Sequence, residues 1–76
     1  MFRVGHIYQH DCSLTNHDIE IVKIVRNSDK EVCMIYRYVN RMTNRVMYNS
    51  NEDFTCMDKK KQKEWTEKKE CQQSME

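Results

Sequence analysis

The chain has no proline and no alanine, and it holds only one glycine, Gly5, and one leucine, Leu14. Alanine and leucine are the best apolar helix formers, so their scarcity argues against a helical body. Isoleucine, valine and tyrosine are common instead, and these residues favour pleated, half-buried surfaces. A single glycine also excludes the glycine-rich loop that cradles phosphates in nucleotide-binding enzymes. We therefore expect a mainly β protein.

Other familiar signals are missing as well. No segment approaches the roughly 20 apolar residues that a membrane span needs, so we expect no membrane partner. The 13 basic and 12 acidic side chains nearly cancel, which removes the overall positive field typical of nucleic-acid-binding proteins. Residues 1–12 contain no apolar export segment, so we expect a cytoplasmic protein with reduced cysteines.

Three segments of the first half read as strands. They are rich in β-branched and aromatic residues, and polar turns separate them. In the second segment the apolar alternation changes phase after Ile21, which predicts a bulge or a bend. The predicted strands are 3–10, 19–27 and 31–40.

Residues 37–48 carry arginines spaced by four, which fits either one face of a helix or a β-hairpin. A helix here would contain no alanine or leucine and would have no apolar stripe at helical spacing. Segment 40–44 has asparagine at each end, and asparagine tolerates the left-handed backbone angles of a tight turn. We predict a hairpin in which 45–49 returns as a strand, with Arg41 at the tip of the loop.

The last third of the chain changes character. Phe54 is expected to be the last core residue. From Met57 onward lysine, glutamate and glutamine dominate, and opposite charges recur four residues apart, as in Lys60–Glu64. This pattern predicts a solvated C-terminal helix over 57–76.

The sequence thus predicts a small β domain over residues 1–56 and a charged C-terminal helix or tail over 57–76. Trp65 stands alone among charged residues in the second part. It would either dock on its own domain or contact another chain, so Trp65 is our candidate for partner binding. A homodimer through this helix or through an exposed edge strand is an alternative for so small a core.

The strand pattern resembles a known kind of protein. The segments in order are "VGHIYQH", "IEIVKI", "EVCMIYRYVN", "RVMYN" and "EDF". Together, over residues 3–55, they resemble the small SH3-like barrels encoded among the accessory genes of tailed phages. The resemblance implies an antiparallel barrel of four to five strands. It does not cover the predicted C-terminal helix, which makes the expected fold class α+β. It also implies a binding module used in host takeover or anti-defence.

Neither catalysis nor metal binding is indicated. His6, His10, Cys12 and His17 are close in sequence, but they lack the paired C-x₂-C spacing of structural zinc sites. On a strand, His6 and His10 would stand about 13 Å apart, too far to share one metal ion. No nucleophile motif is present either. We expect no enzymatic activity, no cofactor and no metal.

Basic and aromatic side chains form the candidate ligand-binding surface. Arginine forks beside flat aromatic faces suit phosphates, bases and acidic groups. Alternatively, the arginines form a solvent face that Asp18, Glu20 and Glu31 partly neutralise, and the tyrosines belong to the core. The candidate ligand-binding residues are Lys23, Arg26, Arg37, Tyr38, Arg41, Arg45 and Tyr48.

Our leading hypothesis is a small non-enzymatic phage-type accessory protein that binds and inhibits a host protein in the host cytoplasm. Loop arginines would steer the partner, and Tyr38 or Tyr48 would anchor it. The second hypothesis is a module that binds nucleic acid or a nucleotide through the same surface. Salt separates the two hypotheses, because nucleic-acid binding falls steeply as salt rises.

Overall fold

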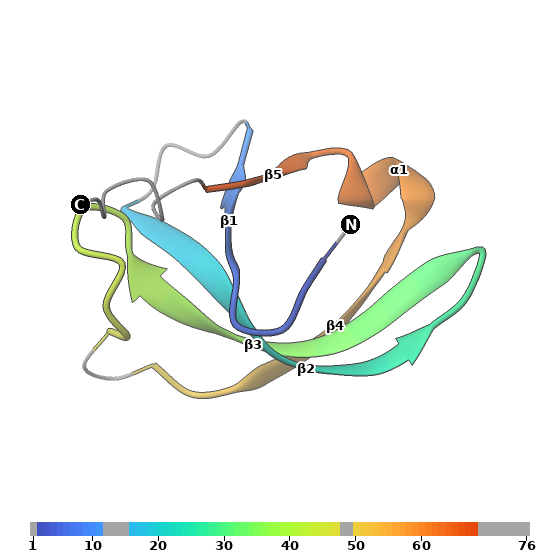
Figure 1. Cartoon of the computed structure of the whole chain (residues 1–76), viewed down its shortest axis with the longest axis horizontal. Coiled ribbons are helices and arrows are strands. Elements are labelled where there is room, and N and C mark those ends of the chain that lie inside the picture. The colour runs from blue at the N-terminus through green and yellow to red at the C-terminus, as the bar shows by residue number, and fades with distance from the viewer. Residues whose placement is uncertain (1, 12–15, 48–49, 69–76) are drawn as a thin grey trace.

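The computed structural model describes residues 2–11, 16–47 and 50–68. The described chain forms one antiparallel sheet of five strands in the order β4-β3-β2-β1-β5, with β4 and β5 at its edges (Figure 1). The mainly β prediction is confirmed, and none of the described helices is long and apolar enough to cross a membrane. The elements are β1 Ile7–His10, β2 His17–Asn27, β3 Glu31–Asn40, β4 Asp53–Asp58, α1 Lys59–Gln62 and β5 Trp65–Glu67.

The sheet is strongly bent, because the pairing of β2 with β3 is irregular at two points. The register shifts between Ile21 and Lys23 and again between Ile24 and Arg26. Bulges of this kind bend a strand and increase its twist. In Figure 1 the long strands β2 and β3 arch below β1 and β5. The phase change predicted after Ile21 is therefore confirmed.

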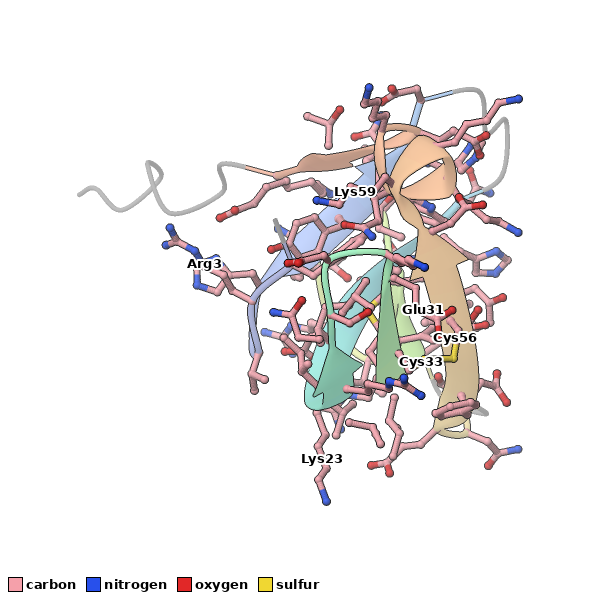
Figure 2. The ribbon with its side chains drawn as sticks, turned by 90° about the vertical axis from the view of Figure 1, so that its right-hand side faces the viewer. Arg3, Lys23, Glu31, Cys33, Cys56 and Lys59 are labelled. Carbon is pink, nitrogen blue, oxygen red and sulfur yellow. A yellow bond between two sulfur atoms is a disulfide. The ribbon has the colours of Figure 1, made fainter. Side chains whose placement is uncertain are left out.

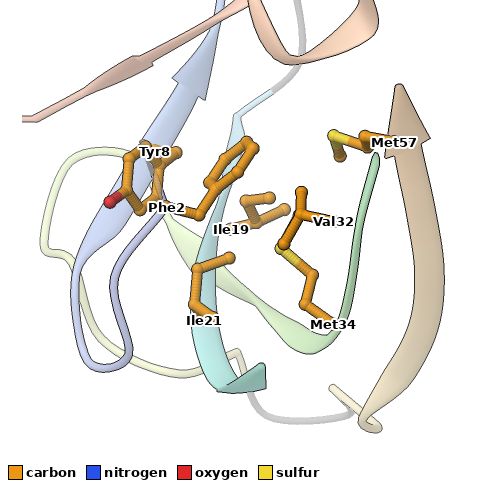
Figure 3. Close-up of a cluster of buried hydrophobic side chains, with 7 residues drawn as sticks. All are labelled: Phe2, Tyr8, Ile19, Ile21, Val32, Met34 and Met57. Carbon is orange, nitrogen blue, oxygen red and sulfur yellow. The ribbon is translucent and has the colours of Figure 1, made fainter. Parts of the chain in front are cut away.

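The hydrophobic core lies on the concave side of this bend. Side chains alternate between the two faces of a strand, so Val32 and Met34 of β3 point into the core cluster, while Cys33 is buried on the opposite face. Trp65 packs against the core, which agrees with docking on its own domain. The core cluster consists of Phe2, Tyr8, Ile19, Ile21, Val32, Met34 and Met57 (Figure 3).

The chain reverses direction at 40–44, as predicted. The Asn40 backbone N–H donates to the Arg45 carbonyl oxygen at 2.8 Å, and the Asn44 N–H donates to the Asn40 carbonyl oxygen at 2.7 Å. Asn44 has a φ of 60°, the left-handed conformation for which asparagine is suited. Within its described residues 45–47, the returning segment makes an isolated bridge between Val39 and Val46 in place of the predicted strand.

The strand that pairs with the first half of β3 is β4, which the sequence did not predict. Phe54, expected in the core, is 61% exposed on β4, so that prediction is wrong. Met57, expected at the start of a helix, lies on β4 and is 4% exposed in the core.

The helix predicted over 57–76 is limited in the described chain to one turn, α1. Asp58 caps this turn by accepting a hydrogen bond from the Lys61 N–H at 2.8 Å. The chain then continues as β5, which pairs with β1, so this part of the segment belongs to the same sheet. Residues 69–76 lie outside the described part.

A buried carboxylate ties three segments together. Asp18 of β2 is 0% exposed, and its Oδ1 accepts from Arg41 Nε at 2.9 Å while its Oδ2 accepts from Lys68 Nζ at 2.7 Å. The Lys68 ammonium also donates to the Arg41 carbonyl oxygen at 2.8 Å and to Asn44 Oδ1 at 2.7 Å. All three donors of the ammonium are thus used. Arg41, expected at an exposed loop tip, is instead part of the structural framework.

Cys33 and Cys56 face each other across β3 and β4 and form a disulfide bond. Figure 2 shows this bond beside Glu31, between the two strands. The expectation of reduced cysteines is therefore wrong for this pair. Cys12 and Cys71 lie outside the described residues.

Replacing Asp18 by alanine should lower the free energy of unfolding by about 3 kcal/mol, because Arg41 and Lys68 would lose their shared, buried counter-charge. Urea denaturation followed by circular dichroism measures this change. Glu20→Ala is the matched control: it breaks the more exposed Arg37–Glu20 pair and should cost less than about 1 kcal/mol. Equal losses in the two variants would contradict the structural role of Asp18.

Reduction of the Cys33–Cys56 disulfide should lower the free energy of unfolding by about 3 kcal/mol, because the bond closes a loop with a sequence separation of 23. Denaturation with and without a phosphine reductant, in a Cys12→Ser/Cys71→Ser background, measures this difference. Identical midpoints under both conditions would show that the bond adds no stability.

Candidate functional site

An aromatic pocket lies on the concave face of the sheet, where β2, β3 and β4 approach α1 and β5. Its volume is about 160 Å³. Aromatic rings, apolar side chains, one hydroxyl and one ammonium group contribute to its wall. The lining residues are Ile19, Tyr36, Tyr38, Thr55, Met57, Lys61 and Trp65.

Two tyrosines form one wall of the aromatic pocket. Tyr36 and Tyr38 are two residues apart on β3, so their side chains share a face. Their ring centroids are 5.6 Å apart with an interplanar angle of 88°, an edge-to-face contact. Burial, followed by a hydrogen bond with Tyr38, raises the pKa of Tyr36 to about 12. Tyr36 is thus a neutral phenol that packs against the core, while Tyr38 is 39% exposed.

Trp65 contributes the indole to the pocket from β5. Its ring meets the His10 ring edge-on at a centroid distance of 4.8 Å, which fixes the orientation of the indole. The indole Nε1 is buried, and it has no hydrogen-bond partner among the described residues. A buried N–H without an acceptor is costly.

The pocket opens beside a short basic segment, which we call the lysine turn and define as Lys59, Lys60, Lys61 and Lys63. All four side chains are exposed, and none forms an ion pair within the described chain. The Asp58 cap and a hydrogen bond of 3.0 Å from Gln62 Nε2 to the Met57 carbonyl oxygen fix the backbone of this turn. The lysine turn therefore places the Lys61 side chain in the wall of the pocket, with three further exposed lysines within two residues of it in the sequence.

The wall of the pocket is mostly aromatic and apolar. The lining residues include no carboxylate, imidazole or thiol, which are the groups that act as general bases or nucleophiles near neutral pH. Flat apolar walls bind an aromatic or aliphatic side chain, and the Lys61 ammonium attracts a carboxylate.

Two of the predicted ligand-binding arginines are already paired within the protein. Arg37 Nε donates to Glu20 Oε1 at 2.9 Å, and Arg41 is held by Asp18. This agrees with the alternative in which acidic residues of neighbouring strands neutralise the arginines.

The remaining predicted cations do not gather at one rim. Arg26 pairs in register with Cys33, whereas Arg45 lies beyond Asn40 at the other end of β3. Seven residues of strand separate these ends by roughly 23 Å. Lys23 projects from β2, far from Lys59 of the lysine turn (Figure 2). Tyr48 lies outside the described residues.

Two of the three histidines considered as zinc ligands, His6 and His10, have carboxylate partners. His6 Nδ1 lies 2.6 Å from Glu67 Oε2, and His10 Nε2 lies 3.0 Å from Glu64 Oε1. The hydrogen bond with His6 lowers the pKa of the Glu67 carboxyl. These contacts fasten the region of β5 to β1.

Of the residues predicted from the sequence, Tyr38 and Trp65 line the aromatic pocket. Tyr36, Met57 and Lys61 also line it but were not among the predicted site residues. For Tyr36 a signal was available, because it shares a strand face with Tyr38. Lys61 reaches the pocket only because α1 is a single turn, a feature that the charge pattern of the segment did not reveal.

Comparisons of the chain with protein-family models, with curated proteins and with solved structures gave no significant match.

Tyr36 should lose its proton only at a pH well above that of a free tyrosine side chain. Burial raises its pKa from 10.0 to about 12. The contribution of the protonated phenol to the free energy of unfolding is therefore fully present below pH 10 and is lost as the pH rises towards 12. Absorbance titration of tyrosinate in wild-type protein and in Tyr36→Phe measures this ionisation as the difference between the two curves. Tyr38→Phe should lower the pKa of Tyr36 only in part, because burial is the larger cause. A difference curve centred near pH 10 would contradict the burial of this phenol.

Proposed function

We propose that the chain is a non-enzymatic protein-binding module whose aromatic pocket takes one apolar side chain of an acidic partner segment. The observation that carries this proposal is the contact between the aromatic pocket and the lysine turn. A volume of about 160 Å³ is small beside the roughly 300–1,000 Å³ of pockets for drug-sized ligands. The pocket therefore suits a single side chain, and the neighbouring ammonium groups suit carboxylates on either side of it.

We also propose that the bent sheet is a small SH3-like barrel of the tailed-phage accessory kind, and that it inhibits a host protein in the host cytoplasm. The strand pattern of residues 3–55 supports the resemblance, and the five-stranded antiparallel order is consistent with it. An inhibitor of this size needs no active site of its own, because it acts by occupying a surface of its partner.

A nucleic-acid-binding function is the second candidate. It is favoured by the exposed side chains of Lys23, Arg26 and Arg45, which have no ion pair in the described segments. Their separation along the hairpin and the neutralisation of Arg37 and Arg41 weaken it. Binding to nucleic acid would fall with a log–log salt slope of about 0.7 to 0.9 per phosphate contacted, whereas a protein partner would lose mainly association rate.

Selection from a displayed random-peptide library should enrich peptides with an aromatic or aliphatic anchor flanked by aspartate or glutamate. Trp65 is the only tryptophan, so its fluorescence reports occupation of the pocket directly. Tyr38→Ala should weaken the selected peptide about thirtyfold, corresponding to a loss of about 2 kcal/mol at an anchoring aromatic residue. Lys61→Glu should weaken it about tenfold, mainly through slower association.

Two matched variants make this experiment specific. Tyr38→Phe keeps the ring and should retain most of the affinity, while Lys30→Glu reverses an exposed charge in the turn between β2 and β3 and should have no effect. The proposal fails if the selected peptides lack acidic residues, or if Tyr38→Ala binds as tightly as the wild type. Capture from host lysate that is abolished by nuclease would favour the second candidate.

A further inference from the structure

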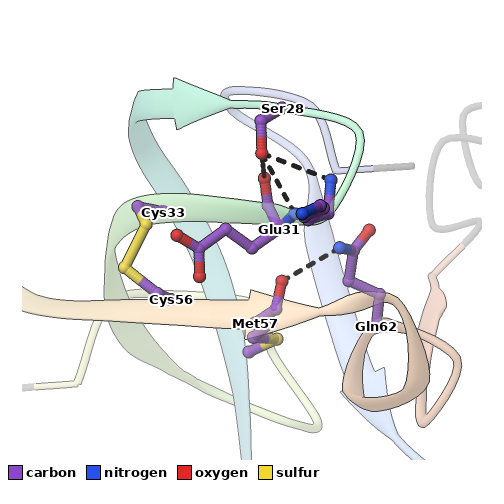
Figure 4. The surroundings of a disulfide bond; sticks show 7 residues. Ser28, Glu31, Cys33, Cys56, Met57 and Gln62 are labelled. Atoms are coloured by element: carbon purple, nitrogen blue, oxygen red, sulfur yellow. Dashed lines mark hydrogen bonds between the residues drawn. A yellow bond between two sulfur atoms is a disulfide. The ribbon is translucent and has the colours of Figure 1, made fainter.

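Three potential metal ligands meet on the convex face of the sheet, opposite the aromatic pocket. The Sγ atoms of Cys33 and Cys56 and a carboxylate oxygen of Glu31 all lie within 4.8 Å of one another. Glu31 and Cys33 are two residues apart on β3 and share a face, and Cys56 faces Cys33 from β4. Figure 4 shows the Glu31 carboxylate next to the disulfide.

The Glu31 carboxylate is otherwise unused. The residue is half-buried, and its backbone groups are bonded by Ser28, but its side chain has no hydrogen bond or ion pair within the described residues. Arg26, the β2 partner of Cys33, brings a positive side chain to the neighbourhood without pairing with Glu31. The Glu31 carboxylate is therefore available as a ligand beside the two sulfur atoms.

The disulfide can be opened without dismantling the sheet. Cys33 is buried, but Cys56 is exposed on the edge strand β4, so a reductant reaches the bond from solvent. Ladder pairs on both sides of the disulfide, such as Val32↔Met57 and Met34↔Thr55, hold β3 and β4 in register. The two thiols would remain opposite each other after reduction.

We propose that the reduced pair Cys33 and Cys56, together with Glu31, forms a binding site for zinc. A dithiol first supplies two electrons and two protons, breaks the S–S bond and becomes a disulfide itself. Zn²⁺ then displaces the two thiol protons and is held by two thiolates and one carboxylate oxygen. A fourth position stays open for water or for a ligand from a partner.

The geometry of this site follows from zinc chemistry. Zn–S distances of about 2.3 Å and tetrahedral angles place the two sulfur atoms about 3.8 Å apart. Rotation about the Cα–Cβ bonds of Cys33 and Cys56 provides this separation, because directly opposed side chains of an antiparallel pair stand within about 4.5–5.5 Å at Cβ. Two soft thiolates select zinc over magnesium and calcium, which prefer oxygen ligands. Disulfide and zinc exclude each other, so the oxidation state of the pair controls metal binding.

The test uses the full chain in a Cys12→Ser/Cys71→Ser background, so that Cys33 and Cys56 are its only cysteines. The protein is reduced with a phosphine, because a thiol reductant would itself compete for the metal. Zn²⁺ is then titrated anaerobically by calorimetry. In a parallel titration, the absorption of bound Co²⁺ reports thiolate coordination. One equivalent of zinc should bind to the reduced protein and none to the oxidised protein. Glu31→Gln should weaken binding at least tenfold, whereas Asp29→Asn, in the exposed turn nearby, should bind as the background protein does.

Circular dichroism shows whether reduction unfolds the chain. One equivalent of zinc should then restore the β spectrum, and it should fail to do so in Glu31→Gln. The proposal is overturned if the reduced protein binds no zinc, if the oxidised protein binds it equally, or if Glu31→Gln changes nothing.

Discussion

The buried carboxylate of Asp18 holds the ends of this small sheet together. It holds Arg41 of the hairpin loop and Lys68 beyond β5, so the two chain segments that close the bend are fastened to β2 by one residue. Without these cations the carboxylate could not be buried, and without the carboxylate the loop and the end of β5 would lose their common anchor. The arginine that best fits a recognition role by sequence is therefore committed to holding the fold.

The first half of the fold could be predicted because its signals are local. The strands β2 and β3 are long runs of β-branched and aromatic residues, the bulge follows from a phase change, and asparagine marks the reversal at 40–44. The second half could not be predicted in this way. β4 contains only one buried residue, Met57, and β5 has only three residues, so neither strand shows a clear alternation of apolar and polar residues. Both strands form because they pair with β3 and β1, which are far away in sequence.

The candidate site was predictable only in part, for a related reason. Tyr38 and Trp65 were chosen because exposed aromatic residues in a charged context favour recognition, and they do line the aromatic pocket. The arginines were chosen by the same argument, but side-chain type does not reveal whether an acidic residue lies opposite on the next strand. Glu20 lies directly across from Arg37, so the register of β2 and β3 neutralises a charge that the sequence alone leaves free.

The two faces of β3 carry different chemistry because of the two-residue period of a strand. Its concave face presents Tyr36 and Tyr38 to the aromatic pocket, and its convex face presents Glu31 and Cys33 to β4. β4 repeats this division, with Thr55 and Met57 in the pocket wall on either side of Cys56 in the sequence. The distance between β3 and β4 therefore affects both the face with the disulfide and the face with the aromatic pocket. The disulfide and the pocket wall are thus separated by a single peptide unit on each side of Cys56.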